Sequence, residues 1–303
     1  MATFTLAEAQ KLGLNDLQSG LATTINTVAP AIGNIPFVRV AGNAYTFNRE
    51  GSIVSGEVVA ADGTITDSTG LTAVPVTVAL SSLSGQSDIP NSILRQAVGE
   101  NGGNDVRAMH IASAAKGVGM KFLDRMVNGT VAANGWDGLK ALFAQSAFAS
   151  QVVDAADAAF DLGLIDEAVS KVQVGGQKII MGNAKAEAKF KAAMRAAGGT
   201  DSVQLNGQYF TSYDGMPFLR NDYIANDQDS GTAGNQSDIY VITFGDGVDG
   251  GVVGLTSANG DLFNLTEFPA LEMKDATRVR VIMDGAMIVR SPLAVAIVKS
   301  VTV

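Results

Sequence analysis

The chain has 303 residues, and its 21 Lys and Arg against 30 Asp and Glu give a formal net charge of −9. It contains no cysteine and one histidine, which excludes thiol catalysis, zinc ribbons and disulfide frameworks and removes most zinc-hydrolase and serine-triad designs. An apolar content of 47% excludes a disordered protein, whereas a charged content of only 17% suggests a surface that other chains partly cover.

The first forty residues predict two short amphipathic helices. Residues 5–8 (TLAE) have the spacing of a helix capping box, and a second helix is expected to follow Asn15 and to end before Pro30. Such helices bury little by themselves, so we expect an arm that lies on another surface. We expect no secretory signal and no membrane span, because no apolar run reaches the roughly 18 residues of a membrane helix. Expression in a cytoplasm is the default.

Residues 42–83 are β-prone. Asp62 and Gly63 indicate a hairpin turn, and apolar residues alternate with small or polar ones over residues 74–81. Pro75 favours an edge strand, because proline cannot donate a ladder hydrogen bond. An isolated two-stranded hairpin is marginal in water, so we expect this one to pack on something else.

The clearest helical pattern spans residues 104–128. Apolar side chains recur there at three- and four-residue spacing, and Asn128 followed by Gly129 indicates the helix end. Gly117 and Gly119 each weaken a helix by roughly 1 kcal/mol relative to Ala, so we expect a close packing contact at these glycines. Further helices are expected over residues 138–148 and 154–172.

The second half of the chain mixes short strands with one clear helix. The expected elements are a strand at 178–181, a helix at 184–197, a hairpin at 205–208, a turn at 213–217, a polar loop at 226–237, a strand at 239–244 and terminal strands at 277–283 and 286–303. No repeat of fixed period is present. The pattern predicts an α+β fold.

Residues 245–250 match the Gly-x-Gly-x-x-Gly pattern of dinucleotide-binding loops, and Glu267 follows about twenty residues later. Such a site needs a helix to begin at the loop and receive the pyrophosphate. Residues 251–260 instead carry three more glycines and no helical period, and Asp246 and Asp249 would repel phosphate. A loop between strands is therefore favoured over a nucleotide-binding enzyme.

No catalytic constellation is visible. His110 has no second His or Cys as a partner, and we interpret it as a packed or capping side chain. Asp227 and Asp229, with the aspartates of the glycine loop, lack the twelve-residue loop and terminal Glu of a calcium site. We therefore expect no enzyme and no catalytic, cofactor-binding or metal-binding residues.

The charges are segregated along the chain. Residues 171–199 hold six basic side chains and one acidic one, whereas residues 200–275 hold twelve acidic side chains and two basic ones. Nucleic-acid contact by the basic segment and a plain solvated helix face are two alternatives. The third is that the basic segment of one copy meets the acidic loops of the next, as electrostatic complementarity favours.

Several short segments occur in a characteristic order: 6–12 (LAEAQKL), 15–17 (NDL), 36–37 (PF), 42–50 (GNAYTFNRE), 66–70 (TDSTG), 136–139 (WDGL), 181–183 (MGN), 215–217 (GMP) and the terminal strands. This order resembles that of tailed-phage major capsid proteins with the Hong Kong 97 fold, and it covers essentially the whole chain. The resemblance implies an N-terminal arm (1–41), an extended β-hairpin loop or E-loop (42–88), a peripheral domain (89–149 and 270–303) with a long spine helix, and an axial domain (150–269).

The resemblance implies a structural protein that self-assembles into pentamers and hexamers of an icosahedral shell. Its expected partners are further copies of itself, portal and scaffolding proteins, a possible cement or decoration protein, and packaged double-stranded DNA bound without sequence specificity. Its expected place is the virion capsid, assembled in the bacterial host cytoplasm. The alternative within the same fold is an encapsulin-type cellular compartment shell.

The resemblance and the charge map together suggest subunit-interface residues. These are Arg49, Glu50, Glu57, Asp62, Asp67, Lys185, Lys189, Arg195, Asp246 and Asp249. Some members of the resembled family join subunits covalently through a lysine on the extended loop. No lysine occurs between Lys11 and Lys116, so we expect noncovalent contacts or a separate cement protein instead.

Overall fold

The computed structural model describes residues 30–52, 58–59, 61, 63, 72–96, 102–133, 135–199, 201–205, 208–226, 235–245, 250–258, 262–269 and 271–303. The two helices expected before Pro30 lie outside these ranges, as do Asp62 and most of the hairpin between residues 53 and 71. Among the described residues, no helix is both long and apolar enough to cross a membrane.

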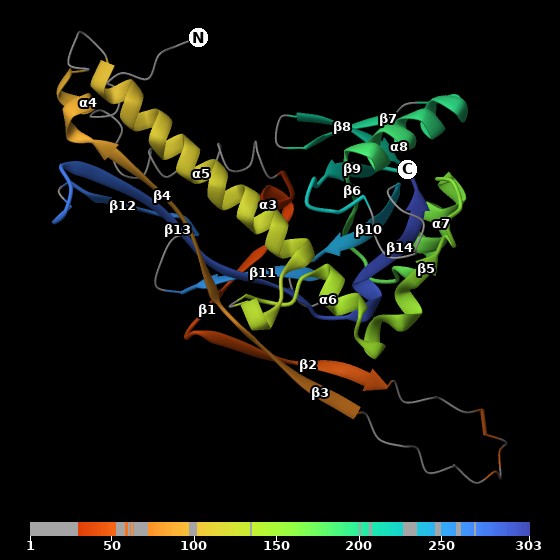
Figure 1. Ribbon diagram of the computed structural model, residues 1–303. Helices are drawn as coiled ribbons and strands as arrows, with labels where there is room; N and C mark the ends of the chain where they lie inside the picture. Colours follow the sequence, from red (N-terminus) through yellow and green to blue (C-terminus); the bar gives the residue numbers. More distant parts are fainter. Residues whose placement is uncertain are drawn as a thin grey trace.

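A long helix lies along an antiparallel pair of strands (Figure 1). The helix is α5 (Gly102–Asn128). In the pair of strands, β4 (Ser81–Pro90) is bonded over the whole of its own length to β13 (Ala276–Val289). The other edge of β13 pairs with β12 (Asn264–Phe268), and α4 (Asn91–Gln96) follows β4 directly. The prediction of a long helix over residues 104–128 is confirmed.

The close contact between this helix and the sheet is made by a strand glycine. A Cβ added to Gly85 on β4 would overlap the main-chain carbonyl of Ala114 on α5. At Gly117, by contrast, nothing lies within 4 Å of an added Cβ. The predicted packing contact is therefore wrong for Gly117, because this residue lies on the exposed side of α5.

A two-stranded hairpin projects away from the body (Figure 1). It consists of β2 (Ala44–Ser52) and β3 (Thr72–Ala79), which pair antiparallel with Ala44 opposite Ala79. Val76 and Val78 are half-buried, whereas Thr77 between them is exposed, so the predicted period of two is confirmed. Only Leu80 separates β3 from β4, so the chain passes almost directly from the hairpin into the body.

The larger lobe is built on a sheet whose two faces are both covered. The strands in spatial order are β5 (Val152–Asp154), β14 (Val295–Thr302), β10 (Gln236–Phe244), β6 (Gln177–Gly182), β9 (Met216–Arg220), β8 (Gln208–Tyr213) and β7 (Asp201–Leu205). Helices α7 (Leu162–Lys171) and α8 (Ala184–Ala196) cover one face. The expected strand, helix and hairpin between residues 178 and 217 are confirmed.

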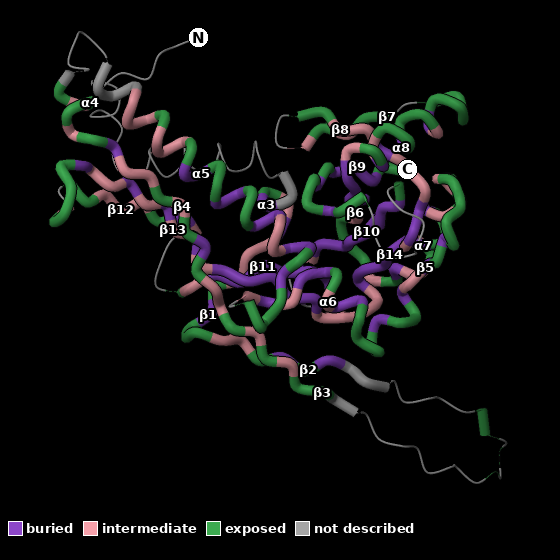
Figure 2. Tube along the Cα trace, viewed as in Figure 1, coloured by how far each residue is buried: buried purple, intermediate pink, exposed green. Residues whose placement is uncertain are grey.

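Strand β10 shows how the sheet divides the core in two. Ile239 and Val241 pack with the residues of α7 and α8, whereas Tyr240, Ile242 and Phe244 pack with the cluster on the opposite face. Alternate side chains of a strand point to opposite faces, so a strand covered on both sides is apolar throughout. Figure 2 shows β10, β11 and β14 as the most continuously buried part of the chain.

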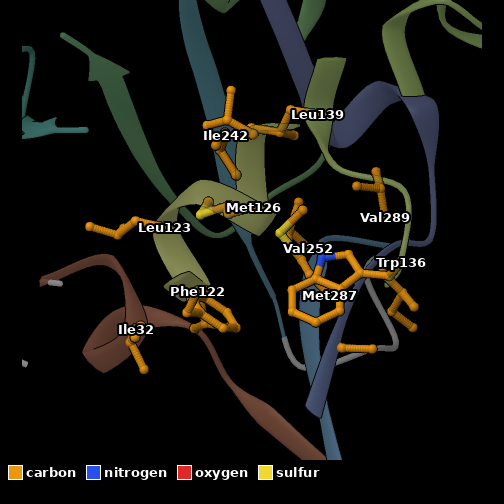
Figure 3. Close-up of a cluster of buried hydrophobic side chains, with 14 of the residues drawn as sticks. Ile32, Phe122, Leu123, Met126, Trp136, Leu139, Ile242, Val252, Met287 and Val289 are labelled. Atoms are coloured by element: carbon orange, nitrogen blue, oxygen red, sulfur yellow. The ribbon is translucent and has the colours of Figure 1, made fainter. Parts of the chain in front are cut away.

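The opposite face is covered by the C-terminal half of α5 and by short elements. These are α3 (Pro30–Asn34), α6 (Leu139–Phe143) and the 3₁₀ turns η2 (Ser146–Gln151) and η3 (Pro292–Ala294), whereas the 3₁₀ turn η1 (Val131–Ala133) has no buried residue. Strands β11 (Val252–Ser257) and β1 (Phe37–Val40) belong to the sheet itself, in which β11 pairs with β10, β13 and β1. Trp136 is 1% exposed and lies with Phe122 and Met287 in this cluster (Figure 3). The ring centroids of Trp136 and Phe122 are 5.8 Å apart.

Two expectations for the second half are corrected. The helix expected over residues 154–172 begins only at Leu162, because the preceding residues form β5 and a tight turn with Ala156 and Asp157 at positive φ. The Asp161 carboxylate then accepts the Gly163 N–H and caps the helix. The sequence predicts terminal strands at 277–283 and 286–303 with an interruption at Ser291 and Pro292. The first part is instead one unbroken β13, whereas the interruption before β14 is confirmed.

Candidate intersubunit surfaces

The hairpin is fixed to the body by a buried arginine. The guanidinium of Arg49 on β2 donates a 2.9 Å hydrogen bond to the carbonyl oxygen of Val289 at the end of β13. It lies 5.0 Å from the ring centroid of Phe148 and 5.8 Å from that of Phe47. Arg49 is only 9% exposed, and its burial lowers the pKa of the guanidinium. This predicted interface residue therefore makes its described contacts within its own chain.

A second arginine holds the same face of β2. Arg290 donates a 3.0 Å hydrogen bond to the Tyr45 hydroxyl and lies 5.7 Å from the centroid of its ring. Tyr45 stacks on Phe47, with ring centroids 6.2 Å apart. Tyr45, Phe47 and Arg49 alternate along β2 and so share one face. The two arginines therefore hold β2 against the body from Tyr45 to Arg49.

The far end of the long helix is secured by ion pairs. Arg278 on β13 binds Asp88 on β4 through two hydrogen bonds of 2.6 and 2.8 Å. This contact lowers the pKa of Asp88 and raises that of Arg278. Arg107 on α5 pairs with Glu267 on β12. These bonds join the helix and all three strands at this end.

A tight turn beside these pairs presents an exposed methionine. Asp275 accepts hydrogen bonds from Asn91 and Arg95, both 2.7 Å long, and these lower its pKa. In the same turn, Leu271 and Lys274 form an isolated bridge. Met273, between them, is 92% exposed. A hollow of about 370 Å³ lies beside it, lined by residues 271–275 and Asn91.

Amide side chains join the helix to the larger lobe. Asn221 donates to the carbonyl of Leu123 at 3.2 Å, and Asn128 donates to the carbonyl of Tyr223 at 3.0 Å. Asn183, which caps α8, donates to the carbonyl of Ile224 at 3.4 Å. The segment after β9 is thereby bonded both to the C-terminal end of α5 and to the start of α8.

The predicted basic residues lie on the outer side of α8. Phe190 and Met194 face the sheet, whereas Lys185, Lys189 and Arg195 are exposed. Lys185 donates to the side-chain oxygen of Asn235 at 3.2 Å, and Arg195 donates to a main-chain carbonyl of its own helix. None of the three forms an ion pair within the described part of the chain.

Acidic side chains gather on α7 and the neighbouring turn. Asp166 accepts hydrogen bonds of 2.9 and 3.1 Å from the Tyr213 hydroxyl. This contact, together with the charges of Asp161 and Asp214, raises the pKa of Tyr213. Glu167 is exposed next to Asp166. This cluster was not predicted, although Asp161, Asp166 and Glu167 lie within seven consecutive residues.

Other predicted interface residues cannot be placed in this arrangement. Glu57, Asp62, Asp67, Asp246 and Asp249 lie outside the described residues. Glu50 is a β2 position whose main chain is opposite Ala73, and its side chain lies outside the description. The sequence analysis also missed Met273, because one apolar residue in a polar turn carries no periodic signal.

The residues considered for catalysis or nucleotide binding make structural contacts instead. The Nδ1 atom of His110 lies 2.6 Å from the Ser87 hydroxyl and joins α5 to β4. The glycine loop leads into β11, which begins at Val252, so the helix required by a dinucleotide site does not follow it. Among the described residues, no group of three acidic or histidine side chains is placed to hold a metal ion.

The arrangement of hairpin, long helix and two-faced sheet has close structural counterparts. The SrpI encapsulin of Synechococcus elongatus PCC 7942 matches 91% of this chain and 89% of its own, with a TM-score of 0.68 and 16% identity. The capsid protein of a native GTA particle matches 92% and 90%, with a TM-score of 0.61 and 12% identity. A chain from Mycobacterium phage Bobi matches 89% and 90%, with a TM-score of 0.60 and 13% identity.

The chain has the Hong Kong 97 capsid fold. The fold predicted from the resemblance is therefore confirmed over about nine-tenths of the chain. No family model matches the sequence, and no curated protein matches it either. Among these counterparts, the fold is shared by an encapsulin and by the capsid of a GTA particle.

Proposed function

We propose that this protein is the major capsid protein of a tailed bacteriophage, and that it self-assembles into an icosahedral shell around double-stranded DNA. The observation that carries the proposal is the match of about nine-tenths of the chain to an encapsulin, to a GTA capsid and to chains from two phages. The role is structural, and no catalytic residue is assigned.

The projecting hairpin supports assembly. Among the described residues, β2 and β3 pair only with each other, and one face of the pair packs on the body through Phe47 and Val76. The other face, with Thr46, Asn48 and Thr77, is exposed. Because a two-stranded ribbon is marginally stable by itself, a neighbouring subunit would cover this second face. The low charged content of the chain agrees with a surface that other copies cover.

The domain plan follows from the same proposal. The arm would comprise residues 1–41, the extended loop 42–88, the peripheral domain 89–149 and 270–303, and the axial domain 150–269. The described hairpin occupies the first part of the extended loop, while β4 at its end pairs with β13 of the peripheral domain. Pentamers, hexamers, a portal, a scaffold and a cement protein belong to this proposal as partners.

An encapsulin-type compartment is the second candidate. The similarity to the SrpI encapsulin favours it, with a TM-score of 0.68 against 0.61 and 0.60 for the GTA capsid and the Bobi chain. The two candidates differ in content, because a virion holds DNA and a compartment holds protein. An acidic shell protein suits DNA packaging, since a negative inner surface would not bind the phosphate backbone tightly.

The test is electron microscopy with sedimentation of the chain produced alone and with its neighbouring genes. Closed particles tens of nanometres across, or rings of subunits, are the expected result. Nuclease treatment followed by analysis of the protected content then separates the candidates: long double-stranded DNA supports the virion, and a single enriched protein supports the compartment. A monomer or dimer under both conditions would refute shell formation.

A further inference from the structure

The two ends of the molecule differ in how their charged side chains form ion pairs within the chain. Around α5, β4 and β13, cations and carboxylates pair within the chain, as in Arg278 with Asp88, Arg95 with Asp275 and Lys121 with Asp124. On α7 and α8 the described charges are mostly left for solvent or for another molecule. The described ion pairs of this lobe are Lys191 with Glu187 and Arg220 with Asp222.

The two helices carry clusters of opposite sign. On α8, Lys185 and Lys189 are exposed and form no ion pair among the described residues; they lie four residues apart and are therefore neighbours on one side of the helix. Exposed acids are Asp166 and Glu167 on α7 and Asp161, the N-cap residue just before it, whereas Lys171 in the last turn of α7 donates to main-chain carbonyls. We call the two clusters the basic surface of α8 and the acidic surface of α7.

The two surfaces are placed over different strands. Helix α7 packs on β14 and β5, whereas α8 packs on β9. Strands β10 and β6 lie between β14 and β9 in the sheet. No ion pair joins the two surfaces within the described chain, although both helices cover the same face. Opposite charges are thus displayed side by side without neutralising each other.

We propose that the basic surface of α8 in one subunit contacts the acidic surface of α7 in a second copy. In the rings that the proposed shell function implies, this contact is head-to-tail: the α8 of each copy meets the α7 of the next copy, and such repeated contacts close into a ring when the rotation between copies allows it. This inference rests on the proposed shell function. The sequence-based prediction placed the acidic partner in the loops between residues 200 and 275, and the proposal places it on α7 instead.

The partner is a second copy because both charges are present on every subunit. A nucleic acid would be attracted by Lys185 and Lys189 but repelled by the neighbouring acids of α7, on a chain whose net charge is −9. Complementary charges mainly raise the association rate and fix the register of an interface. Their effect falls as salt shortens the screening length from about 30 Å at 0.01 M to about 8 Å at 0.15 M.

The test compares assembly thresholds of charge-reversed full-length chains at low salt, by sedimentation and electron microscopy. Lys185→Glu with Lys189→Glu is expected to raise the protein concentration needed for assembly at least tenfold, and high salt is expected to narrow this difference. The decisive variant adds Asp166→Lys and Glu167→Lys to the first pair, which restores opposite charges across the contact. Its threshold is expected within about threefold of the wild-type value.

The control is Lys116→Glu with Lys140→Glu, which changes the net charge equally on exposed residues outside α7 and α8. Its threshold is expected to stay close to wild type. A wild-type threshold in the first variant, or no recovery in the four-residue variant, overturns the pairing while leaving the shell function intact. A wild-type chain that forms neither rings nor shells overturns both. Thermal unfolding confirms that each variant is folded.

Discussion

Gly85 of β4 packs directly against the main-chain carbonyl of Ala114 in α5, and no side chain fits between them. The next neighbour of an added Cβ, a methyl carbon of Val118, would lie at 3.1 Å. The long helix and the β4–β13 ladder are therefore in contact at backbone level. This contact sets how closely the helix can lie along the sheet.

Gly85→Ala is expected to lower the free energy of unfolding by about 1–3 kcal/mol, because the added methyl group must push the helix away from the strand. Gly117→Ala, on the helix α5 that Gly85 touches, is the matched control, since it adds a methyl group in open space. The control is expected to stabilise by up to about 1 kcal/mol through helix propensity. Denaturant unfolding measures the free energy of unfolding of both variants and so checks this prediction. Equal effects of the same sign would contradict the packing argument.

Arg49→Ala is expected to lower the free energy of unfolding by about 2 kcal/mol, because it removes a charged hydrogen bond to Val289 and the stacking on Phe148. Hydrogen exchange should also become faster in β2 and β3. Arg39→Ala, which truncates an exposed arginine on β1, is the control and should change neither quantity measurably. Unchanged exchange in the hairpin of the Arg49 variant would show that Arg49 does not anchor it.

Ala156→Gly is expected to stabilise the protein. Ala156 has φ of 46° and Asp157 has φ of 66°, so the turn after β5 holds two non-glycine residues in the left-handed region. Relief of about 1–2 kcal/mol at Ala156, less the extra chain entropy of glycine, leaves a gain of about 0.5–1 kcal/mol. Ala158→Gly, two residues on, lacks a positive φ and should destabilise. Melting curves of the two variants should shift in opposite directions.

Acid pH should destabilise the end of the molecule at which Arg278 pairs with Asp88. The Arg278 hydrogen bonds lower the folded-state pKa of Asp88 below its ordinary value of 3.8, so their stabilising effect is present above that pH. It is lost as the pH falls through the lower folded value. Asp88→Asn should remove this part of the pH dependence while leaving the effect of Asp275. An unaltered acid transition in that variant would count against the pair.

Removal of residues 1–29 is expected to leave a folded subunit that does not close shells. The described core begins at α3, where Ile32 and Ile35 are buried, so the truncation leaves these contacts in place. Circular dichroism and electron microscopy of the truncated chain check folding and assembly separately. Normal shells from this chain would refute an assembly role for the arm.

Local sequence patterns were sufficient for the elements whose signal is periodic or made by a few adjacent residues. The helix α5 with its three- and four-residue spacing, the helix α8 expected from residue 184 and the turn at Asp214 and Gly215 all form where the sequence predicted them. The helix expected from residue 154 failed because its first half is recruited by β14. Ala155 and Phe160 donate main-chain hydrogen bonds to that strand instead of forming a helix.

The candidate surfaces were predicted only in part. Lys185 and Lys189 lie outward on α8 because the apolar spacing of that helix fixes which side faces the sheet. The acidic surface of α7 depends on where the chain places Tyr213 beside Asp166, a contact between residues 47 positions apart. Spacing along the chain carries no information about such a contact.

The sequence by itself determined the composition of this protein: it has no cysteine, one histidine and few charges, and the low charged content predicts a surface that other chains partly cover. The order of its short sequence segments along the chain also indicated the fold. Only the tertiary structure decided which residues are internal supports and which face outward. Arg49 shows the difference, because the pairing of β2 with β3 turns it toward Phe148 and Val289, and long-range packing rather than local pattern determines burial.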